Sequence, residues 1–186
     1  MSAREPQTAT MSKNSPPDIE ILFDHDAIRS RVAELGRQIE SEIGSEDPLL
    51  IGLLEGSLIF LSDLVRSIPA PVRFELIQVS SGEDSGVIRI EYPIPVDIAG
   101  QSVVVVKDVV ASGVTEPYLG QQLRDHGARQ VRFAALVDLP DERKTDFRPD
   151  YAAFSTPRRG VLVGYGLKHL GRYGNLSSVG RVRGTE

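Results

Sequence analysis

The hydrophobic positions along the chain follow two periods, which predict alternating helices and strands. Between Asp24 and Gly44, apolar residues recur at steps of three and four, which predicts an amphipathic helix. Asp24 or Asp26 can cap the start of this helix, and Gly44 can end it. The segments Leu49–Leu54 and Ser102–Val110 are dominated by consecutive aliphatic residues, which is typical of strands buried on both faces.

The rest of the chain continues this alternation up to a glycine-rich, irregular C-terminal segment. A second helix is expected after Gly56, with residues 59–61 on its buried side, and a third near Pro117. Helices between uniformly apolar strands predict an α/β fold, a mostly parallel, twisted sheet flanked by helices. The polar residues 1–18 are predicted to be a disordered tail and residues 19–186 a single domain. Further strands are predicted at residues 72–79, 87–92, 131–137, 151–154 and 161–163.

The composition excludes several kinds of chemistry. The 186 residues include no cysteine, which excludes a disulfide scaffold, a thiol nucleophile and a cysteine zinc site. The three histidines are far apart in the sequence, which argues against a histidine metal centre. A net charge of −5 argues against a general nucleic-acid binder. No apolar run approaches the ~18 residues of a membrane span, and the N-terminus lacks the apolar core of a signal peptide. We therefore expect a cytoplasmic protein that acts on a small molecule.

The loop after the strand Ser102–Val110 is the first candidate for a ligand site. In open α/β sheets, ligands bind beyond the carboxyl ends of the strands. Here a buried strand leads through Ser112 and Gly113 to Thr115 at a helix N-terminus, where hydroxyls and free N–H groups favour an anion. The loop is a candidate phosphate site, and the alternative is an ordinary tight connection with a capping threonine.

Four segments together resemble the hypoxanthine-guanine phosphoribosyltransferases, a branch of the type I phosphoribosyltransferase family. They are Leu50–Leu64, Phe74–Ile90, Val103–Leu119 and Val163–Val182. The resemblance implies the family's core, a mostly parallel sheet with helices, and a small C-terminal hood region. It also implies transfer of a phosphoribosyl group from phosphoribosyl pyrophosphate to hypoxanthine or guanine, with Mg²⁺ if the chain is active. A homodimer or homotetramer is expected, with residues 76–92 and the helix after Gly56 as contact surfaces.

The signature of this family aligns with residues 107–115, which read KDVVASGVT. The resemblance assigns phosphate binding to Ser112, Gly113, Val114 and Thr115, and ribose binding to Asp108. It places Ala111 where the family has an aspartate as candidate general base near purine N7. Alanine cannot accept a proton, so no intact catalytic residue is expected at this position.

Other ligand-facing positions of the family also differ in this chain. The resemblance implies an acid where Lys107 stands and a lysine before Gly56 where Glu55 stands. The flexible catalytic loop is about four residues shorter, at Gly82–Ser85. Two further departures concern the purine: Asp138 replaces the family's lysine that binds the purine oxygen, and Val161 or Leu162 replaces the aromatic residue that stacks on the base. Two others concern pyrophosphate: Lys168 replaces the aspartate near magnesium and pyrophosphate, and Gly174 replaces an arginine that contacts pyrophosphate.

These reversals lead to one structural and three functional hypotheses. Because Glu55 and Lys168 have opposite signs at positions the resemblance places on one ligand, we expect them to face each other. The chain is then a weak or non-catalytic relative that binds a purine nucleotide or phosphate, without a metal site of its own. An active purine phosphoribosyltransferase is the first alternative. An RNA-binding regulator, like the related pyrimidine-operon attenuators, is the second, and the acidic net charge argues against it.

Overall fold

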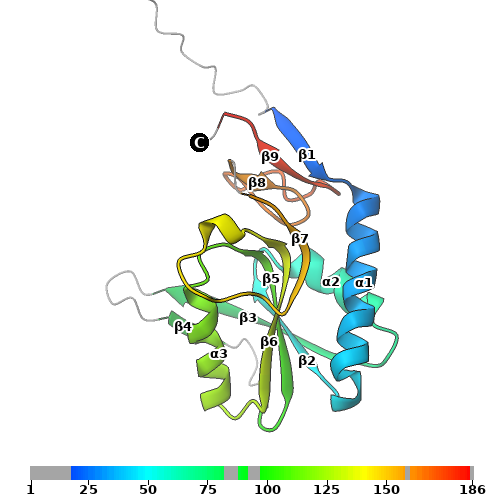
Figure 1. Cartoon of the computed structure of the whole chain (residues 1–186), viewed down its shortest axis with the longest axis vertical. Coiled ribbons are helices and arrows are strands. Elements are labelled where there is room, and N and C mark those ends of the chain that lie inside the picture. The colour runs from blue at the N-terminus through cyan, green and yellow to red at the C-terminus, as the bar shows by residue number, and fades with distance from the viewer. Residues whose placement is uncertain (1–17, 82–87, 92–96, 158–159, 185–186) are drawn as a thin grey trace, which may run out of the picture.

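The computed structural model describes residues 18–81, 88–91, 97–157 and 160–184, and the side chains of 79–81 and 88–91 are left out. Within these residues the main sheet has six strands in the order β4-β3-β2-β5-β6-β7 (Figure 1). The strands from β3 to β7 in this order are parallel, and β4 pairs antiparallel with β3. This confirms the predicted α/β class. The strands are β2 (Leu49–Leu54), β3 (Arg73–Ser81), β4 (Ile88–Glu91), β5 (Ser102–Val110), β6 (Gln130–Asp138) and β7 (Tyr151–Ser155).

Strand β5 lies at the centre of the sheet because both of its faces are apolar. Residues Val103 to Val106 are all at most 1% exposed, and they pair in parallel with β2 and β6. Successive side chains of a strand point to opposite faces. Val104 and Val106 accordingly join one core cluster, whereas Val103 and Val105 join the other. Full burial of one such side chain contributes about 1.5–3 kcal/mol. The predicted bounds of β5 are confirmed.

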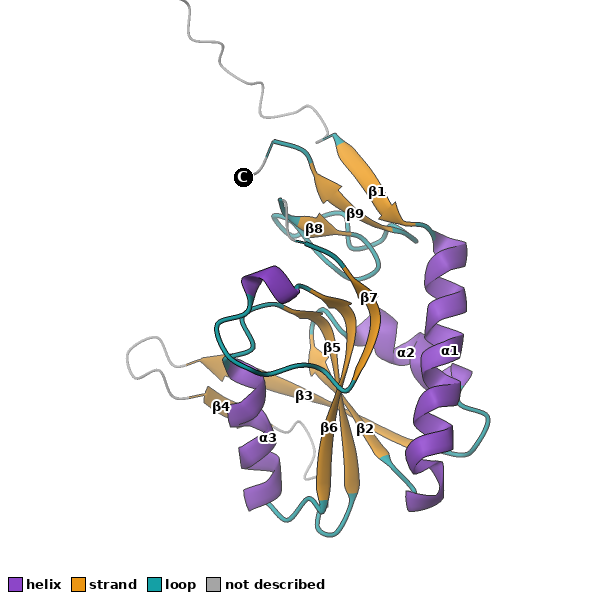
Figure 2. Cartoon of the chain, in the orientation of Figure 1, coloured by secondary structure: helices purple, strands orange, loops and turns teal. Residues whose placement is uncertain are grey.

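Three helices cover the two faces of the sheet. Helix α1 (His25–Ile43) and helix α2 (Leu58–Ser67) pack on one face, and α3 (Thr115–Asp125) packs on the other (Figure 2). Asp24 caps α1, because its Oδ1 accepts a hydrogen bond from the N–H of Ala27 at 2.8 Å. No helix in the described part of the chain is long and apolar enough to cross a membrane.

The prediction for the buried side of α2 was wrong at one residue. Phe60, Leu61 and Leu64 are buried, but Ile59 is 37% exposed. The helix begins only at Leu58, and the Cβ of Ile59, in its first turn, lies 3.8 Å from the Cβ position of Gly166. The apolar run was therefore longer than the buried face.

A second sheet joins the two ends of the described chain. It has the order β1-β9-β8, all antiparallel, with β1 at Ile19–Phe23, β8 at Leu162–Val163 and β9 at Val179–Val182. The sequence patterns missed β1 and β9, because each is short and finds its partner at the other end of the chain. This small sheet and residues 164–178, which we call the hood segment, form the hood region above the main sheet (Figure 1). The predicted tail, residues 1–18, lies outside the described residues except for Asp18.

A polar cluster around the buried Tyr151 fastens α1 to the edge of the main sheet. Arg132 donates to the hydroxyl of Tyr151 at 2.7 Å, and that hydroxyl donates to Glu42 Oε2 at 3.0 Å. Arg132 also pairs with Glu42 at 2.9 Å. Burial raises the pKa of Tyr151 to about 12, so the hydroxyl keeps its proton at all physiological pH values.

Two short 3₁₀ helices complete the described elements. They lie at Gly44–Glu46 and Pro140–Glu142.

Candidate functional site

Several of the predicted site residues meet at the carboxyl edge of the main sheet. Since β2, β5 and β6 are parallel, the segments that follow them start at the same edge. These segments are the turn at residues 55–57, which we call the β2–α2 turn, and the loop Ser112–Thr115, which we call the phosphate loop. The hood region lies above this edge (Figure 2).

The conformation of the phosphate loop is fixed by hydrogen bonds from residues 144 and 145 to its backbone carbonyls. Gly113 has φ +72°, a left-handed conformation that favours glycine. The Thr145 hydroxyl donates to the Gly113 carbonyl at 2.8 Å, and the Lys144 N–H donates to the Ser112 carbonyl at 2.8 Å. A Cβ on Gly113 would lie 2.7 Å from Arg143 Cδ, so a side chain has no room there. The loop geometry is therefore fixed by contacts on its inner side.

Helix α3 begins within the phosphate loop. Its N-cap residue is Val114, and no side-chain hydrogen bond caps the helix. Thr115 is the first helical residue, so the alternative in which it acts as a simple cap is wrong. The first N–H groups of a helix have no partner within the helix and carry the positive end of its dipole. This arrangement is the one that binds anions at helix N-termini.

Asp108 lies directly against the β2–α2 turn. Its Oδ1 accepts a hydrogen bond from the Val109 N–H at 2.8 Å. A Cβ on Gly56 would lie only 1.8 Å from Asp108 Oδ2, so position 56 requires glycine. The turn itself is fixed by the Ser57 hydroxyl, which donates to the Leu53 carbonyl at 2.6 Å. The carboxylate predicted to bind ribose is thus half-buried and held in one place.

Glu55 and Lys168 form an ion pair, as the opposite charges predicted. Lys168 Nζ donates to Glu55 Oε2 at 2.6 Å. This hydrogen bond, together with the positive charge of Lys168, lowers the pKa of Glu55. The pair joins the hood segment to the β2–α2 turn, where the backbone of Gly166 also packs against the Gly56 carbonyl. Gly174 lies beside the stem of Lys168, with its Cβ position 3.1 Å from Lys168 Cγ.

Lys107 forms a buried ion pair with Glu116. Its Nζ contacts Glu116 Oε1, and the two side chains are 16% and 3% exposed. The second carboxylate oxygen, Oε2, is buried without a hydrogen-bond partner. Lys107 therefore ties β5 to the first turn of α3. Sequence reasoning missed Glu116, because a charged residue in a first helical turn ordinarily faces solvent.

The other predicted positions have separate surroundings. Asp138, at the end of β6, pairs with Arg143, a residue that sequence reasoning did not single out. Ala111 and Leu162 are partly buried and pack against the same core cluster, Leu162 from β8. Val161 precedes β8, and its backbone carbonyl accepts a hydrogen bond from the Val182 N–H at 2.9 Å. The shortened loop Gly82–Ser85 lies outside the described residues.

The carboxylates at the β2–α2 turn are those of Glu55 and Asp108. Mg²⁺ prefers oxygen ligands in octahedral geometry and is usually held through one or two carboxylates. Glu55 is paired with Lys168, and Asp108 accepts a hydrogen bond from the Val109 N–H. Across the described residues, no group of three or more histidine, aspartate or glutamate side chains is placed to hold a metal ion together.

Comparison with known proteins agrees with this geometry. A sequence model of the phosphoribosyl transferase domain matches residues 18–168. The hypoxanthine-guanine phosphoribosyltransferase of Mycobacterium tuberculosis is 38% identical over 178 residues, which cover 90% of this chain and 88% of that protein. The enzyme of the same name from Bacillus subtilis is 34% identical over 171 residues, covering 89% and 94%.

Solved structures give the same result. A crystal structure of a hypoxanthine-guanine phosphoribosyltransferase from Bacillus anthracis superposes with a TM-score of 0.81 at 32% identity, covering 89% of this chain and 99% of that one. The fold and the phosphate loop thus define a phosphoribosyl transferase domain. Within that family, the chain belongs to the hypoxanthine-guanine phosphoribosyltransferases.

Proposed function

We propose that this chain keeps the phosphate half of a purine phosphoribosyltransferase site and binds a purine nucleoside monophosphate or phosphate there. Transfer of the phosphoribosyl group is weak or absent. The backbone-built phosphate loop, with its uncapped helix N-terminus, supports the binding half of this proposal. The family resemblance places Ala111 at the position of the catalytic base, so no catalytic residue supports transfer of the phosphoribosyl group.

One observation carries the proposal, the ion pair between Lys168 and Glu55 at 2.6 Å. The family resemblance assigns both positions to pyrophosphate and magnesium. Here the two side chains neutralise each other, and a carboxylate stands where a cation would meet pyrophosphate. A pyrophosphate group would have to displace Lys168 from Glu55 and would then face the released carboxylate. We therefore expect phosphoribosyl pyrophosphate to bind poorly.

Two further contacts support the same conclusion. Ala111 has no group that can accept or donate a proton, and general acid–base help is typically worth about 10²–10⁴ in rate. Lys107 is committed to Glu116 in a buried pair, so it is not a mobile group available to a ligand.

Calorimetry tests the binding half. GMP, IMP, and phosphoribosyl pyrophosphate with Mg²⁺ are titrated separately into the full chain, and GMP and IMP are titrated again with EDTA. We expect the monophosphates to bind with and without the metal, and phosphoribosyl pyrophosphate to bind at least about tenfold more weakly. Thr115→Val removes a hydroxyl from the phosphate loop and should weaken GMP, whereas Ser41→Ala on the exposed face of α1 should not. Absence of GMP and IMP binding would refute the proposal.

An active purine phosphoribosyltransferase is the second candidate function. The observation in its favour is that relatives 34–38% identical over most of their length bear the name of that enzyme. Purified chain is assayed with phosphoribosyl pyrophosphate, Mg²⁺ and either hypoxanthine or guanine, beside the Mycobacterium tuberculosis enzyme. Turnover comparable to that enzyme establishes the second candidate and overturns the first.

The outer side of α2 supports a proposal about assembly. Leu58 is 49% exposed and Ile59 is 37% exposed, at the start of the helix after Gly56. We propose that residues 19–186 form one domain and that this face contacts a second copy in a homodimer or homotetramer. Light scattering coupled to size exclusion should show an oligomer that Leu58→Glu dissociates. A monomer at all concentrations would contradict the proposal.

A further inference from the structure

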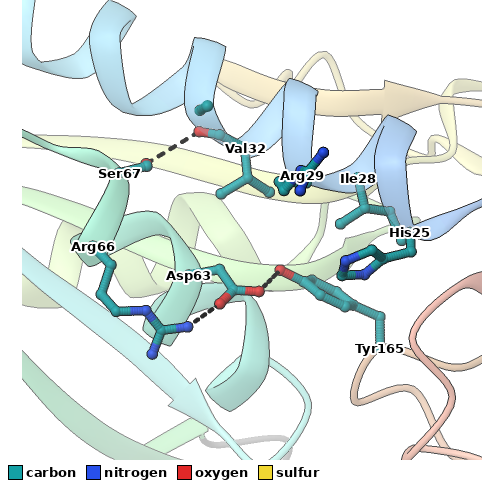
Figure 3. Close-up of a pocket in the computed structure, with 9 residues that line it drawn as sticks. His25, Ile28, Arg29, Val32, Asp63, Arg66, Ser67 and Tyr165 are labelled. Atoms are coloured by element: carbon teal, nitrogen blue, oxygen red, sulfur yellow. Dashed lines mark hydrogen bonds and ion pairs between the residues drawn. The ribbon is translucent and has the colours of Figure 1, made fainter.

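A cavity lies between α1 and α2. Its volume is about 230 Å³, and Tyr165 from the hood segment lines it together with residues of both helices (Figure 3). None of its lining residues belongs to the phosphate loop or the β2–α2 turn. It is therefore a separate site with its own chemistry.

The inner wall of this cavity is apolar. Ile28 and Val32 of α1 are 1% and 3% exposed, and Ala33 lies beside them. The polar groups of the wall are already bonded within the protein. Ser67 donates to the Val32 carbonyl at 3.2 Å and to the Leu64 carbonyl at 2.7 Å. A ligand here therefore needs an apolar body.

Asp63 is the one carboxylate that lines the cavity, and both its oxygens are occupied. Oδ2 accepts a hydrogen bond from the Tyr165 hydroxyl, and Oδ1 pairs with Arg66. Burial and this hydrogen bond raise the pKa of Tyr165, so the hydroxyl remains a donor. The negative charge of Asp63 is thus balanced within the protein. The groups available to a ligand are therefore those at the rim of the cavity.

The rim carries cationic and imidazole groups. Arg29 and His25 line the cavity from α1, and Arg66 lines it from α2. Among the described residues, Arg29 pairs with Asp26 at 3.3 Å, and both side chains are more than 70% exposed, so that pair is easily exchanged. Asp26 does not line the cavity. The free guanidinium donors therefore favour a ligand carboxylate, which Arg binds in a fork geometry.

The size of the cavity limits the apolar part to a single ring. An apolar cavity of about 150 Å³ holds one benzene molecule. At about 230 Å³, this cavity has room for one ring and a carboxylate. Aromatic rings at Tyr165 and His25 add favourable contacts to a planar ring. We infer that the cavity between α1 and α2 binds a one-ring aromatic carboxylate, with the ring against Ile28 and Val32 and the carboxylate at Arg29.

Occupation of this cavity would act on the hood segment. The Tyr165 N–H donates to the Leu176 carbonyl at 2.8 Å, and the next residue, Gly166, packs against the Gly56 carbonyl. Lys168 follows two residues later and pairs with Glu55. A ligand that holds the Tyr165 ring therefore stabilises the segment that carries Lys168. The inference about binding stands without the proposed nucleotide function.

Ligand-observed NMR and calorimetry on the full chain test this inference with benzoate as the probe. We expect a benzoate Kd of about 1 mM or tighter. Benzyl alcohol, which lacks the charge, and acetate, which lacks the ring, should each bind at least about fivefold more weakly. Equal affinity for benzoate and benzyl alcohol would overturn the carboxylate assignment, and no benzoate binding would overturn the site.

Two variants and one matched control locate the binding. Arg29→Gln should weaken benzoate about fivefold, which is the scale of one exposed ion pair. Ala33→Leu should abolish binding by filling the half-buried cavity, and its thermal melt shows whether it remains folded. Arg37→Gln, on the same helix but not lining the cavity, should change nothing. Benzoate binding that survives both Ala33→Leu and Arg29→Gln unchanged would overturn the proposal.

Discussion

The two halves of the site at the carboxyl edge differ in composition: one is formed by backbone and the other by charged side chains. The phosphate loop Ser112–Thr115 consists of backbone in a fixed conformation, supported from behind by Lys144 and Thr145. The opposite half consists of charged side chains, Glu55 paired with Lys168. A second pair, Lys107 with Glu116, lies at the start of α3, directly after the loop. A backbone site needs only glycine and space, so it tolerates wide sequence change. A side-chain site loses its chemistry when single charges change.

The scaffold below both halves is the same as in the relatives. At 32% identity the chain superposes on the Bacillus anthracis structure with a TM-score of 0.81. The buried valines of β5 and the apolar face of α1 maintain this framework and play no part in ligand recognition. Function is therefore decided by a few residues placed on a common fold.

Breaking the pair between Lys107 and Glu116, at the start of α3, should have the largest effect. Lys107→Met leaves the Glu116 carboxylate buried and unpaired, and we expect the free energy of unfolding to fall by about 3–5 kcal/mol. Urea denaturation measures this change. The double variant Lys107→Met/Glu116→Leu removes both charges and should recover most of the loss. A loss below about 1 kcal/mol in the single variant would show that Lys107 is not a structural residue.

Gly113→Ala should disrupt the backbone conformation of the phosphate loop. A residue other than glycine at φ +72° costs about 1–2 kcal/mol, and the new Cβ would also meet Arg143 and Thr145 at 2.7 Å. GMP binding should be lost together with this stability. Gly100→Ala is the matched control, because Gly100 has φ +71° and nothing within 4 Å of its Cβ position. Equal stability losses in the two variants would show that the contacts behind the loop are unimportant.

Glu55→Lys should change binding more than stability. The substitution removes the carboxylate and places a second cation beside Lys168, so we expect pyrophosphate to bind about tenfold more tightly at low salt. The free energy of unfolding should hardly change, because exposed pairs contribute little. Calorimetry at two salt concentrations checks both points, since screening should reduce the gain. Unchanged pyrophosphate affinity would show that this half does not face the ligand.

The smallest expected effect is the pH dependence of the same pair. Lys168 lowers the pKa of Glu55 from its ordinary value of 4.5 in the folded chain. The stabilisation is therefore fully present above pH 4.5 and is lost as the pH falls through the lowered pKa. The difference in Tm between the wild type and Glu55→Gln should be constant near neutral pH and vanish in acid. A difference that grows toward low pH would have the wrong sign.

Local patterns predicted the centre of the main sheet well because strands β2 and β5 are buried on both faces. The bounds of β2 and β5 matched the apolar runs Leu49–Leu54 and Ser102–Val110. Strands β1 and β9 were missed, because what makes them strands is a partner at the far end of the chain. A short segment with a distant partner leaves no local signal.

The same distinction applies to the candidate site. The Glu55–Lys168 pair was predictable, because two opposite charge changes fell on positions assigned to one ligand. Glu116 and Arg143 were not, because they become partners of Lys107 and Asp138 only when α3 and the 3₁₀ segment take their places. Pairing between elements requires the fold itself.

The pairing of β1 with β9 also sets an order for assembly during synthesis. Ile19 lies opposite Val182, so the first strand of the chain must wait for the last one to leave the ribosome. The six-stranded sheet, by contrast, is complete once residue 155 has emerged. Contacts between distant segments form slowly, and N-terminal parts fold first during translation. Lys168, carried by the late hood segment, is thus among the last groups to be positioned, so a nascent chain has its phosphate loop before it has the pair that closes the other half.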